Sequence, residues 1–183
     1  LYHDDPALGP GEGRAGRTAQ MGDIVHLPAG GVEIAVDILA AGPIERVELF
    51  NGKDLVETVR PYAPEALGRR IRVLWEGAEY RGRFREVIWD GTARAVGDRI
   101  VEARPINFLN RDKTLDRVGA DGLAWRALTT GNFGGFDALL ADGRSGRLQL
   151  ETPLVSVDLP LAEIGLEDRL FEANGVLPRF VKI

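Results

Sequence analysis

The stretch that decides the fold runs from Ile44 to Arg60 and reads IERVELFNGKDLVETVR. On both sides of Asn51-Gly52, apolar residues alternate with polar ones, which is the pattern of a strand with one buried face. Asn and Gly tolerate positive φ, so this dipeptide between two alternating runs is a strong hairpin signal. The sequence therefore predicts a β-hairpin centred on Asn51-Gly52.

Alternation continues on both sides of this hairpin. Residues 32–38 alternate upstream and predict a strand, while Ile71, Val73 and Trp75 form an apolar face downstream. Residues 80–89 read as a long partner strand for that face, and the polar residues 107–122 read as a long surface loop. Further strands are expected at 99–104, 123–129, 136–141, 147–152, 155–159, 169–172 and 179–183.

About a dozen short strands with nearly regular turn signals are typical of a sandwich or a barrel. We expect an all-β fold: a two-layer antiparallel sandwich, immunoglobulin-like or jelly-roll-like, with little or no helix. Residues 1–22 are rich in Gly and Pro and predict an extended arm or linker. Residues 23–183 are expected to form a single domain, the C-terminal part of a longer protein.

Composition excludes several classes of function. The 183 residues contain no cysteine, which removes disulfides, cysteine-ligated metals and thiol nucleophiles. The net charge is -5 and basic residues are scattered, so we expect no nucleic-acid partner. No apolar run approaches the roughly 18 residues of a membrane span. The absence of cysteine slightly favours the cytoplasm but leaves the compartment open.

Catalytic chemistry has few candidates. The two histidines are His3, beside Asp4 and Asp5 in the arm, and His26; neither is expected to bind a metal. Without a histidine near a serine, an acyl-transfer triad is hard to build. The glycine-rich run 129–136 predicts a tight connection or bulge, because a phosphate cradle needs a following helix and a strand follows here. We therefore predict no catalytic residue, metal or cofactor.

Three tryptophans offer the remaining candidates for a site. Trp75 and Trp125 are expected in the core. Trp89 follows arginines on the same strand parity, so it is either a half-exposed cation–π brace or part of a ligand site. The candidate ligand-binding residues are Trp89, Asp90, Arg83, Asn107 and Asn110.

Several stretches resemble a bacterial family, domain of unknown function 3604. Its longer members join a PHP-type, metal-dependent phosphoesterase-like domain to a C-terminal β region. The stretches lie between residues 17 and 136, and they are 19–24, 43–52, 75–77, 81–83, 89–91 and 129–131. The family's catalytic His-x-His element has no counterpart here, so the resemblance implies the C-terminal β region alone. It also implies that the longer protein is a metal-dependent phosphoesterase or hydrolase.

Together these observations predict a non-catalytic accessory domain that packs on, or modulates, an upstream domain of the same polypeptide. A homo-oligomer is also left open. The alternative is a carbohydrate- or small-ligand-binding module that uses Trp89 and the polar loop 107–116. Neither the ligand nor the compartment follows from the sequence.

Overall fold

The computed structural model describes residues 33–80, 85–143 and 145–183. The chain divides into two units, Leu1–Pro43 and Ile44–Ile183, and the described strands all lie in the second. The described residues contain no α-helix, only the short 3-10 turns η2 (Pro64–Ala66) and η3 (Leu161–Glu163). The all-β prediction is confirmed. The predicted end of the arm at residue 22 lies outside the described residues.

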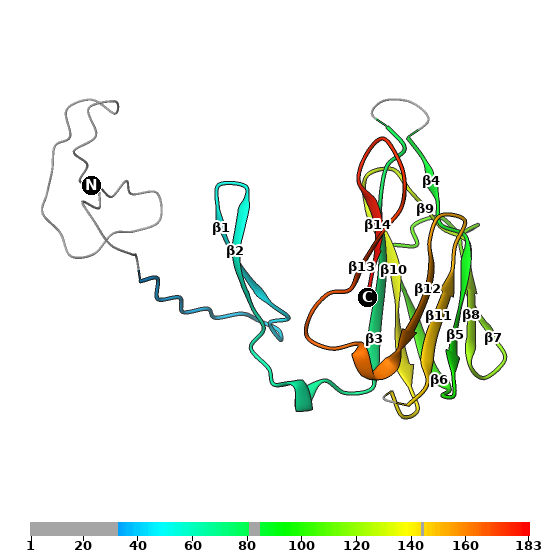
Figure 1. The fold of residues 1–183 in the computed structure, drawn as a ribbon, viewed down its shortest axis with the longest axis horizontal. Coiled ribbons are helices and arrows are strands. Elements are labelled where there is room, and N and C mark those ends of the chain that lie inside the picture. Colours follow the sequence, from blue (N-terminus) through cyan, green and yellow to red (C-terminus); the bar gives the residue numbers. More distant parts are fainter. Residues whose placement is uncertain (1–32, 81–84, 144) are drawn as a thin grey trace, which may run out of the picture. The chain divides into compact units, whose positions relative to one another are not determined.

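Two five-stranded antiparallel sheets form the body of the second unit (Figure 1). Sheet one has, in spatial order, the strands β13 (Leu170–Glu172), β14 (Arg179–Lys182), β3 (Arg70–Gly77), β10 (Phe133–Leu140) and β6 (Ile100–Ile106). Sheet two has, in spatial order, the strands β12 (Ser156–Pro160), β11 (Arg147–Glu151), β5 (Gly91–Val96), β8 (Gly122–Trp125) and β7 (Leu115–Val118). Two further strands, β4 (Val87–Ile88) and β9 (Leu128–Thr129), pair with each other.

The strands of the sandwich pair in a nested order. Early strand β3 pairs with last strand β14, β5 with β11, β6 with β10, and β7 with β8. Nested pairs that alternate between two sheets are the pattern of a jelly roll. An immunoglobulin sandwich groups its strands differently. Of the two predicted styles, the strand order therefore matches the jelly-roll-like one.

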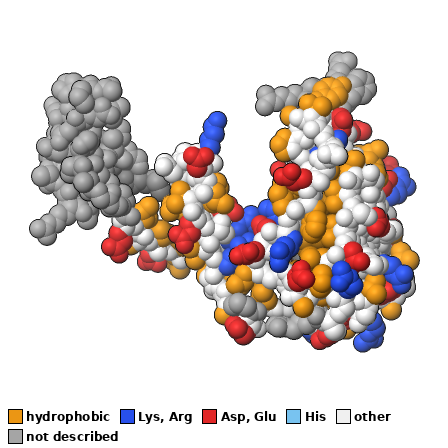
Figure 2. Space-filling view, viewed as in Figure 1, with side chains coloured by type: hydrophobic (Ala, Val, Ile, Leu, Met, Phe, Trp, Pro, Cys, Tyr) orange, Lys and Arg blue, Asp and Glu red, His pale blue; other side chains and the backbone are white. Residues whose placement is uncertain are grey.

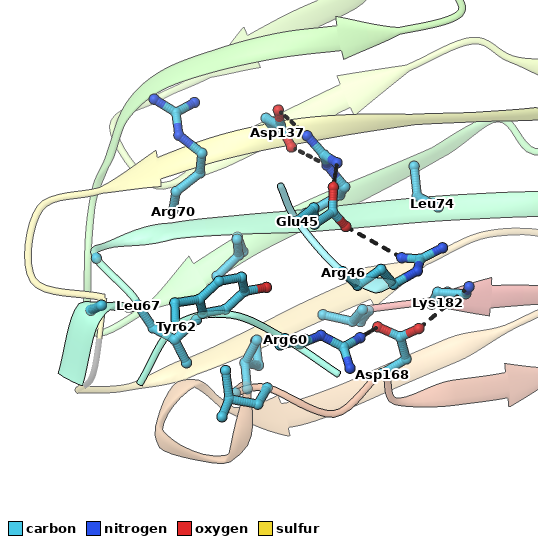
Figure 3. Close-up of a pocket in the computed structure, with 18 residues that line it drawn as sticks. Glu45, Arg46, Arg60, Tyr62, Leu67, Arg70, Leu74, Asp137, Asp168 and Lys182 are labelled. Carbon is cyan, nitrogen blue, oxygen red and sulfur yellow. Dashed lines mark hydrogen bonds and ion pairs between the residues drawn. The ribbon is translucent and has the colours of Figure 1, made fainter. Parts of the chain in front are cut away.

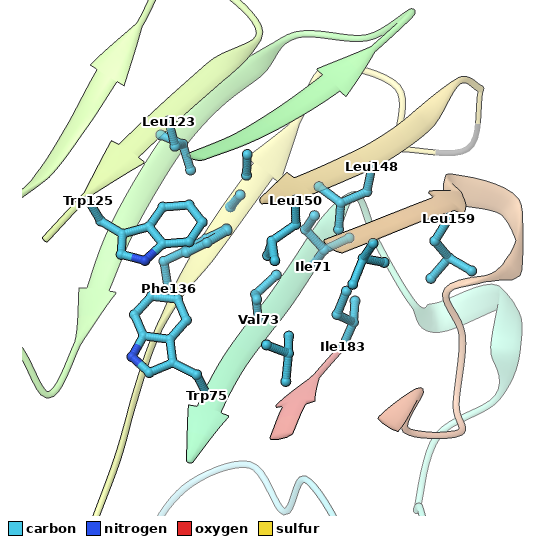
Figure 4. Packing of buried hydrophobic residues seen from close by; sticks show 14 of the residues in the cluster. Ile71, Val73, Trp75, Leu123, Trp125, Phe136, Leu148, Leu150, Leu159 and Ile183 are labelled. Carbon is cyan, nitrogen blue, oxygen red and sulfur yellow. The ribbon is translucent and has the colours of Figure 1, made fainter. Parts of the chain in front are cut away.

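The core lies between the two sheets (Figure 4). Trp75 of β3 stacks on Trp125 of β8, with ring centroids 5.1 Å apart and planes 8° from parallel. Phe136 of β10 packs against Trp125 at 5.3 Å. Trp75 and Trp125 are 0% and 3% exposed, which confirms the predicted core positions. Burial of large aromatic side chains dominates the energetics of such a core.

The predicted hairpin is present as a separate two-stranded sheet. Strands β1 (Val47–Asn51) and β2 (Asp54–Val59) pair antiparallel, with Asn51 opposite Asp54. Gly52 adopts a φ of +64°, the left-handed conformation that the turn requires and that glycine adopts at little cost. The Asn-Gly signal is therefore confirmed.

Three other segments differ from expectation. Residues 33–38 form no strand, and Ile34, Val36 and Ile38 are exposed, because a strand needs a neighbour to pair with its edge and none is found among the described residues. In the described part of 80–89 only β4 is a strand, so the long strand is not found there. The supposed loop 107–122 contains β7, at the edge of sheet two, where polar side chains are tolerated.

Candidate functional site

Trp89 is fully buried and does not stand half-exposed as the sequence suggested. Its indole Nε1 donates a hydrogen bond to Oγ1 of Thr129 at 2.8 Å, and that hydroxyl donates to the backbone carbonyl of Gly77 at 2.7 Å. Val87 and Trp89 share one side of the chain and are both buried, while Ile88 between them is 53% exposed, so the side that carries Trp89 faces the core. The ring is thus part of the core and offers no surface for a ligand to stack on.

Asp90 has a local structural task. Its Oδ1 accepts a hydrogen bond from the backbone N–H of Ala127 at 2.8 Å, which ties the entry to β5 to the segment between β8 and β9. Arg83, the third candidate of this region, lies outside the described residues, as do His3, Asp4, Asp5 and His26.

Asn107 and Asn110 do line a common pocket. They lie in the connection between β6 and β7, and the cavity beside them measures about 180 Å³. We call it the Trp75 pocket, and it is lined by Trp75, Asn107–Asn110, Lys113, Ala127, Leu128, Thr130, Asn132 and Gly134. The segments 107–113 and 127–134 therefore meet Trp75, which is distant in the sequence, around one cavity.

Asn107 is held in an uncommon backbone conformation at this pocket. Its φ is +58°, the one positive value among the described non-glycine residues. Its side-chain Nδ2 donates a hydrogen bond to the backbone carbonyl of Phe133 at 3.1 Å, which joins the two segments of the pocket wall. Asparagine is among the residues that tolerate the left-handed region best.

Trp75 contributes a buried polar atom to this pocket. Its indole Nε1 has no hydrogen-bond acceptor among the described residues, although the side chain is 0% exposed. A Cβ placed on Gly134, the residue opposite Trp75 on β10, would lie 2.8 Å from this nitrogen, so the absence of a side chain there lets the indole approach the backbone closely. The sequence predicted the burial of Trp75 from its parity with Val73, but parity carries no information on where the N–H points.

A second, larger cavity of about 380 Å³ lies between sheet one and the segments 45–68 and 164–168 (Figure 3). We call it the charged pocket. Its charged lining residues are Glu45, Arg46, Arg60, Arg70, Arg72, Asp137, Asp168 and Lys182. No local pattern in the sequence reveals it, because these residues are dispersed along the chain and converge only through the pairing of β3 with β10 and β14.

Ion pairs occupy most of the charged pocket. Arg72 contacts Asp137 at 2.8 Å and Glu45 at 2.9 Å. Asp168 is shared by Arg60 at 2.9 Å and Lys182 at 3.4 Å. The hydrogen bond to Asp137 is the largest cause that raises the pKa of Arg72 above its ordinary value.

These pairs also attach the hairpin to the sandwich. Glu45 and Arg60 flank the hairpin, and their partners lie on β3 and just before β13. All three lining carboxylates already accept hydrogen bonds from arginine, so none is a free base. The arrangement is suited to fixing the base of the hairpin and does not assemble an acid and a base for catalysis.

Two further features concern the described part of the chain alone. No three His, Cys, Asp or Glu side chains within it come together to hold a metal ion. None of its helical segments has the length and apolar character that crossing a membrane would demand.

The described residues form an all-β sandwich of jelly-roll-like pairing, with the Trp75 pocket and the charged pocket among its cavities. Comparison with family models, with curated proteins and with solved structures finds no match to the chain.

Proposed function

We propose that this chain is a non-catalytic accessory domain that docks on another domain of the same polypeptide through the hairpin β1–β2. The observation that carries the proposal is the exposed apolar surface of that hairpin. Phe50, Leu55, Val56 and Val59 are each at least 50% exposed. On the visible face of the hairpin, hydrophobic side chains stand among charged ones (Figure 2).

A hairpin of this kind needs a partner. An isolated two-stranded sheet is marginally stable in water, and β1 and β2 pair only with each other among the described strands. Their outer edges therefore present unpaired backbone groups, which are templates for pairing with a further strand. The ion pairs of Glu45 and Arg60 hold the base of the hairpin and leave its tip projecting.

The first unit presents a second stripe of the same kind. Ile34, Val36 and Ile38 alternate along an extended segment and are 56%, 61% and 45% exposed. Alternating apolar residues of this kind suit a strand that is completed by a partner. A partner that offers a sheet edge would bury this stripe. The resemblance to the phosphoesterase-associated family supports a metal-dependent hydrolase-like domain as that partner.

Hydrogen–deuterium exchange on the longer gene product tests the docking. We expect amides 47–59 to exchange more slowly in the longer product than in the 183-residue chain. Replacing Phe50 and Leu55 by Ser should remove that protection, whereas Val101→Ser, which alters a residue of β6 that is 51% exposed, should not. Equal exchange in both proteins, or a gene that encodes no further domain, would refute the proposal.

A phosphoesterase assay with manganese or zinc tests the non-catalytic part. Activity and bound metal are expected in the longer product and not in the 183-residue chain. Turnover by this chain alone, with stoichiometric metal, would show that it is itself the enzyme. Protection of amides 47–59 that rises with the concentration of this chain would instead indicate a homo-oligomer.

The second candidate is a small-ligand-binding module. It is favoured by the Trp75 pocket, which brings together two of the candidate residues, Asn107 and Asn110, beside a buried indole N–H. The pocket is small, and Trp89 lies in the core, so an extended sugar-stacking platform finds no support. Titration of monosaccharides followed by tryptophan fluorescence separates a carbohydrate ligand from other ligands of this size.

A further inference from the structure

We propose that the Trp75 pocket binds a small organic carboxylate, with the indole N–H of Trp75 and the ammonium group of Lys113 as its hydrogen-bond donors. The inference rests on the second candidate function and names the ligand class for that site.

The indole N–H of Trp75 sets the first requirement. In Figure 4 the indole nitrogen points away from the packed cluster. It lies beside Gly134, which lines the pocket, and it has no acceptor among the described residues. An indole N–H is a donor only, and a buried donor without a partner is costly. The pocket therefore favours a ligand whose acceptor oxygen reaches the N–H of Trp75.

Two further amide groups of the wall have donors to offer. Asn110 uses its Oδ1 to accept the backbone N–H of Asp112 at 3.0 Å, and Asn132 uses its Oδ1 for the N–H of Thr130 at 2.8 Å. Each of these two amides keeps its NH₂ free to donate, whereas Asn107 uses its Nδ2 for the carbonyl of Phe133 and keeps its oxygen. Such a wall is matched by a ligand that carries more than one acceptor oxygen.

Charge distinguishes a carboxylate from a neutral acceptor. Lys113 is half-buried in the pocket wall, and no acidic residue belongs to the lining. Among the described residues no carboxylate forms an ion pair with Lys113. An anionic oxygen would accept a strong, charge-assisted hydrogen bond from the ammonium group. A neutral amide or hydroxyl oxygen would accept a weaker one.

Size and wall chemistry restrict the rest of the ligand. The cavity measures about 180 Å³, and a protein cavity of about 150 Å³ can bind benzene. Phe108 packs edge-on against Trp75 at 6.2 Å and, with Leu128, gives the pocket an apolar side. A carboxylate on one aromatic ring or on a short aliphatic chain satisfies both sides of the pocket.

Nuclear magnetic resonance tests the proposal on the whole chain labelled with ¹⁵N. The protein has three tryptophans and thus three indole N–H signals, of which that of Trp75 is assigned through its own side-chain connectivities. Sodium benzoate is the probe, and benzamide is the neutral control of equal shape. We expect benzoate to shift the Trp75 signal saturably, and benzamide to bind at least about fivefold more weakly, the difference that one partly exposed ion pair makes.

Two variants locate the binding. Lys113→Gln should weaken benzoate about fivefold, whereas Lys53→Gln in the hairpin turn should leave it unchanged. Gly134→Ala places a methyl group 2.8 Å from the indole nitrogen and should abolish the shift. Lys113→Gln changes a wall residue outside the core, so it tests the site even if Gly134→Ala fails to fold.

The outcomes separate the two levels of the proposal. A Trp75 signal that moves with benzamide as strongly as with benzoate would keep the pocket as a ligand site and overturn the carboxylate. A signal that moves with neither probe would overturn both. A shift with benzoate that survives in Lys113→Gln at full affinity would also overturn the assignment of the ammonium group.

Discussion

Arg72 and Asp137 face each other across β3 and β10 and form a two-pronged ion pair, with Nε to Oδ1 at 2.8 Å and Nη2 to Oδ2 at 3.1 Å. Their side chains are 46% and 16% exposed, so water screens the pair only in part. We expect Asp137→Asn to lower the free energy of unfolding by about 0.5–1 kcal/mol, and by less in 1 M salt. Urea unfolding measures this, with Asp158→Asn, at the more exposed pair with Arg147, as a control that should lose less. Equal losses of unfolding free energy in both variants, at both salt concentrations, would show that the Arg72–Asp137 pair stabilises the fold no more than the exposed Arg147–Asp158 pair.

Asp98 joins two turns through its carboxylate and makes the stability depend on pH. Burial alone would raise the pKa of Asp98, but hydrogen bonds from the backbone N–H groups of Gly143, Arg99 and Asp142 hold that pKa below its usual value. The carboxylate therefore stabilises the fold fully above the unfolded pKa of about 3.9, and this contribution is lost as the pH falls through the lower, folded pKa.

The corresponding variant is Asp98→Asn. At pH 7 it should lose about 1 kcal/mol of unfolding free energy, a value reduced because Asp98 is partly exposed. In urea titrations, the difference in unfolding free energy between this variant and the wild type should shrink as the pH is lowered below 4. Glu57→Gln on β2 serves as the control and should show no comparable deficit at pH 7. A deficit for Asp98→Asn that stays constant down to low pH would mean that the charge is not what matters.

Thr129 connects Trp89 to the backbone of Gly77 through one buried hydroxyl group. Thr129→Val keeps the shape of the side chain but leaves the indole N–H of Trp89 without its partner, while the carbonyl of Gly77 still accepts the backbone N–H of Gly131 at 2.9 Å. We expect a loss of about 1–3 kcal/mol in the free energy of unfolding. Thr92→Val on the exposed face of β5 is the matched control and should change stability little. Calorimetry measures the stability of both variants. If Thr129→Val were as stable as Thr92→Val, water would have replaced the hydroxyl group.

Gly135 brings β10 into close contact with β3. A Cβ at this position would lie 2.1 Å from the backbone oxygen of Val73, and backbone cannot move aside as a side chain can. We expect Gly135→Ala to lower the unfolding free energy by about 2–3 kcal/mol. Gly165→Ala, where nothing lies within 4 Å of the added methyl group, should be close to neutral. Thermal melts that shift equally in both variants would indicate that the sheet adjusts its spacing.

Local patterns predicted the parts of the fold that depend on local chemistry. Asn51-Gly52 sets the hairpin turn because both residues accept positive φ, and the alternation of Val73 and Trp75 set the buried face of β3. Both features concern residues that are neighbours along the chain. The strand order could not follow from them, because the pairing of β3 with β14 joins segments from opposite ends of the sandwich sequence.

The candidate site was predicted in part. Polarity was a sufficient signal for Asn107 and Asn110, which lie at the Trp75 pocket. For Trp89 the arginines of the same parity pointed to an exposed face, but Val87 and Trp89 are both buried and Ile88 between them is exposed, so that face turns to the core. The unpartnered N–H of Trp75 lies closely against Gly134 of the neighbouring strand, and only the tertiary structure shows that approach.

The nested pairing of the sandwich has a consequence for synthesis of the chain. Sheet one places β3 between β14 and β10, so β3 keeps one open edge until the last strand has left the ribosome. Pairings between distant segments form slowly, because a long loop must close before any contact rewards it. A nascent chain with that edge open is prone to pair with a strand of another molecule. Production of this domain should therefore depend on how fast its final residues are translated and on chaperones that shield β3 in the interval.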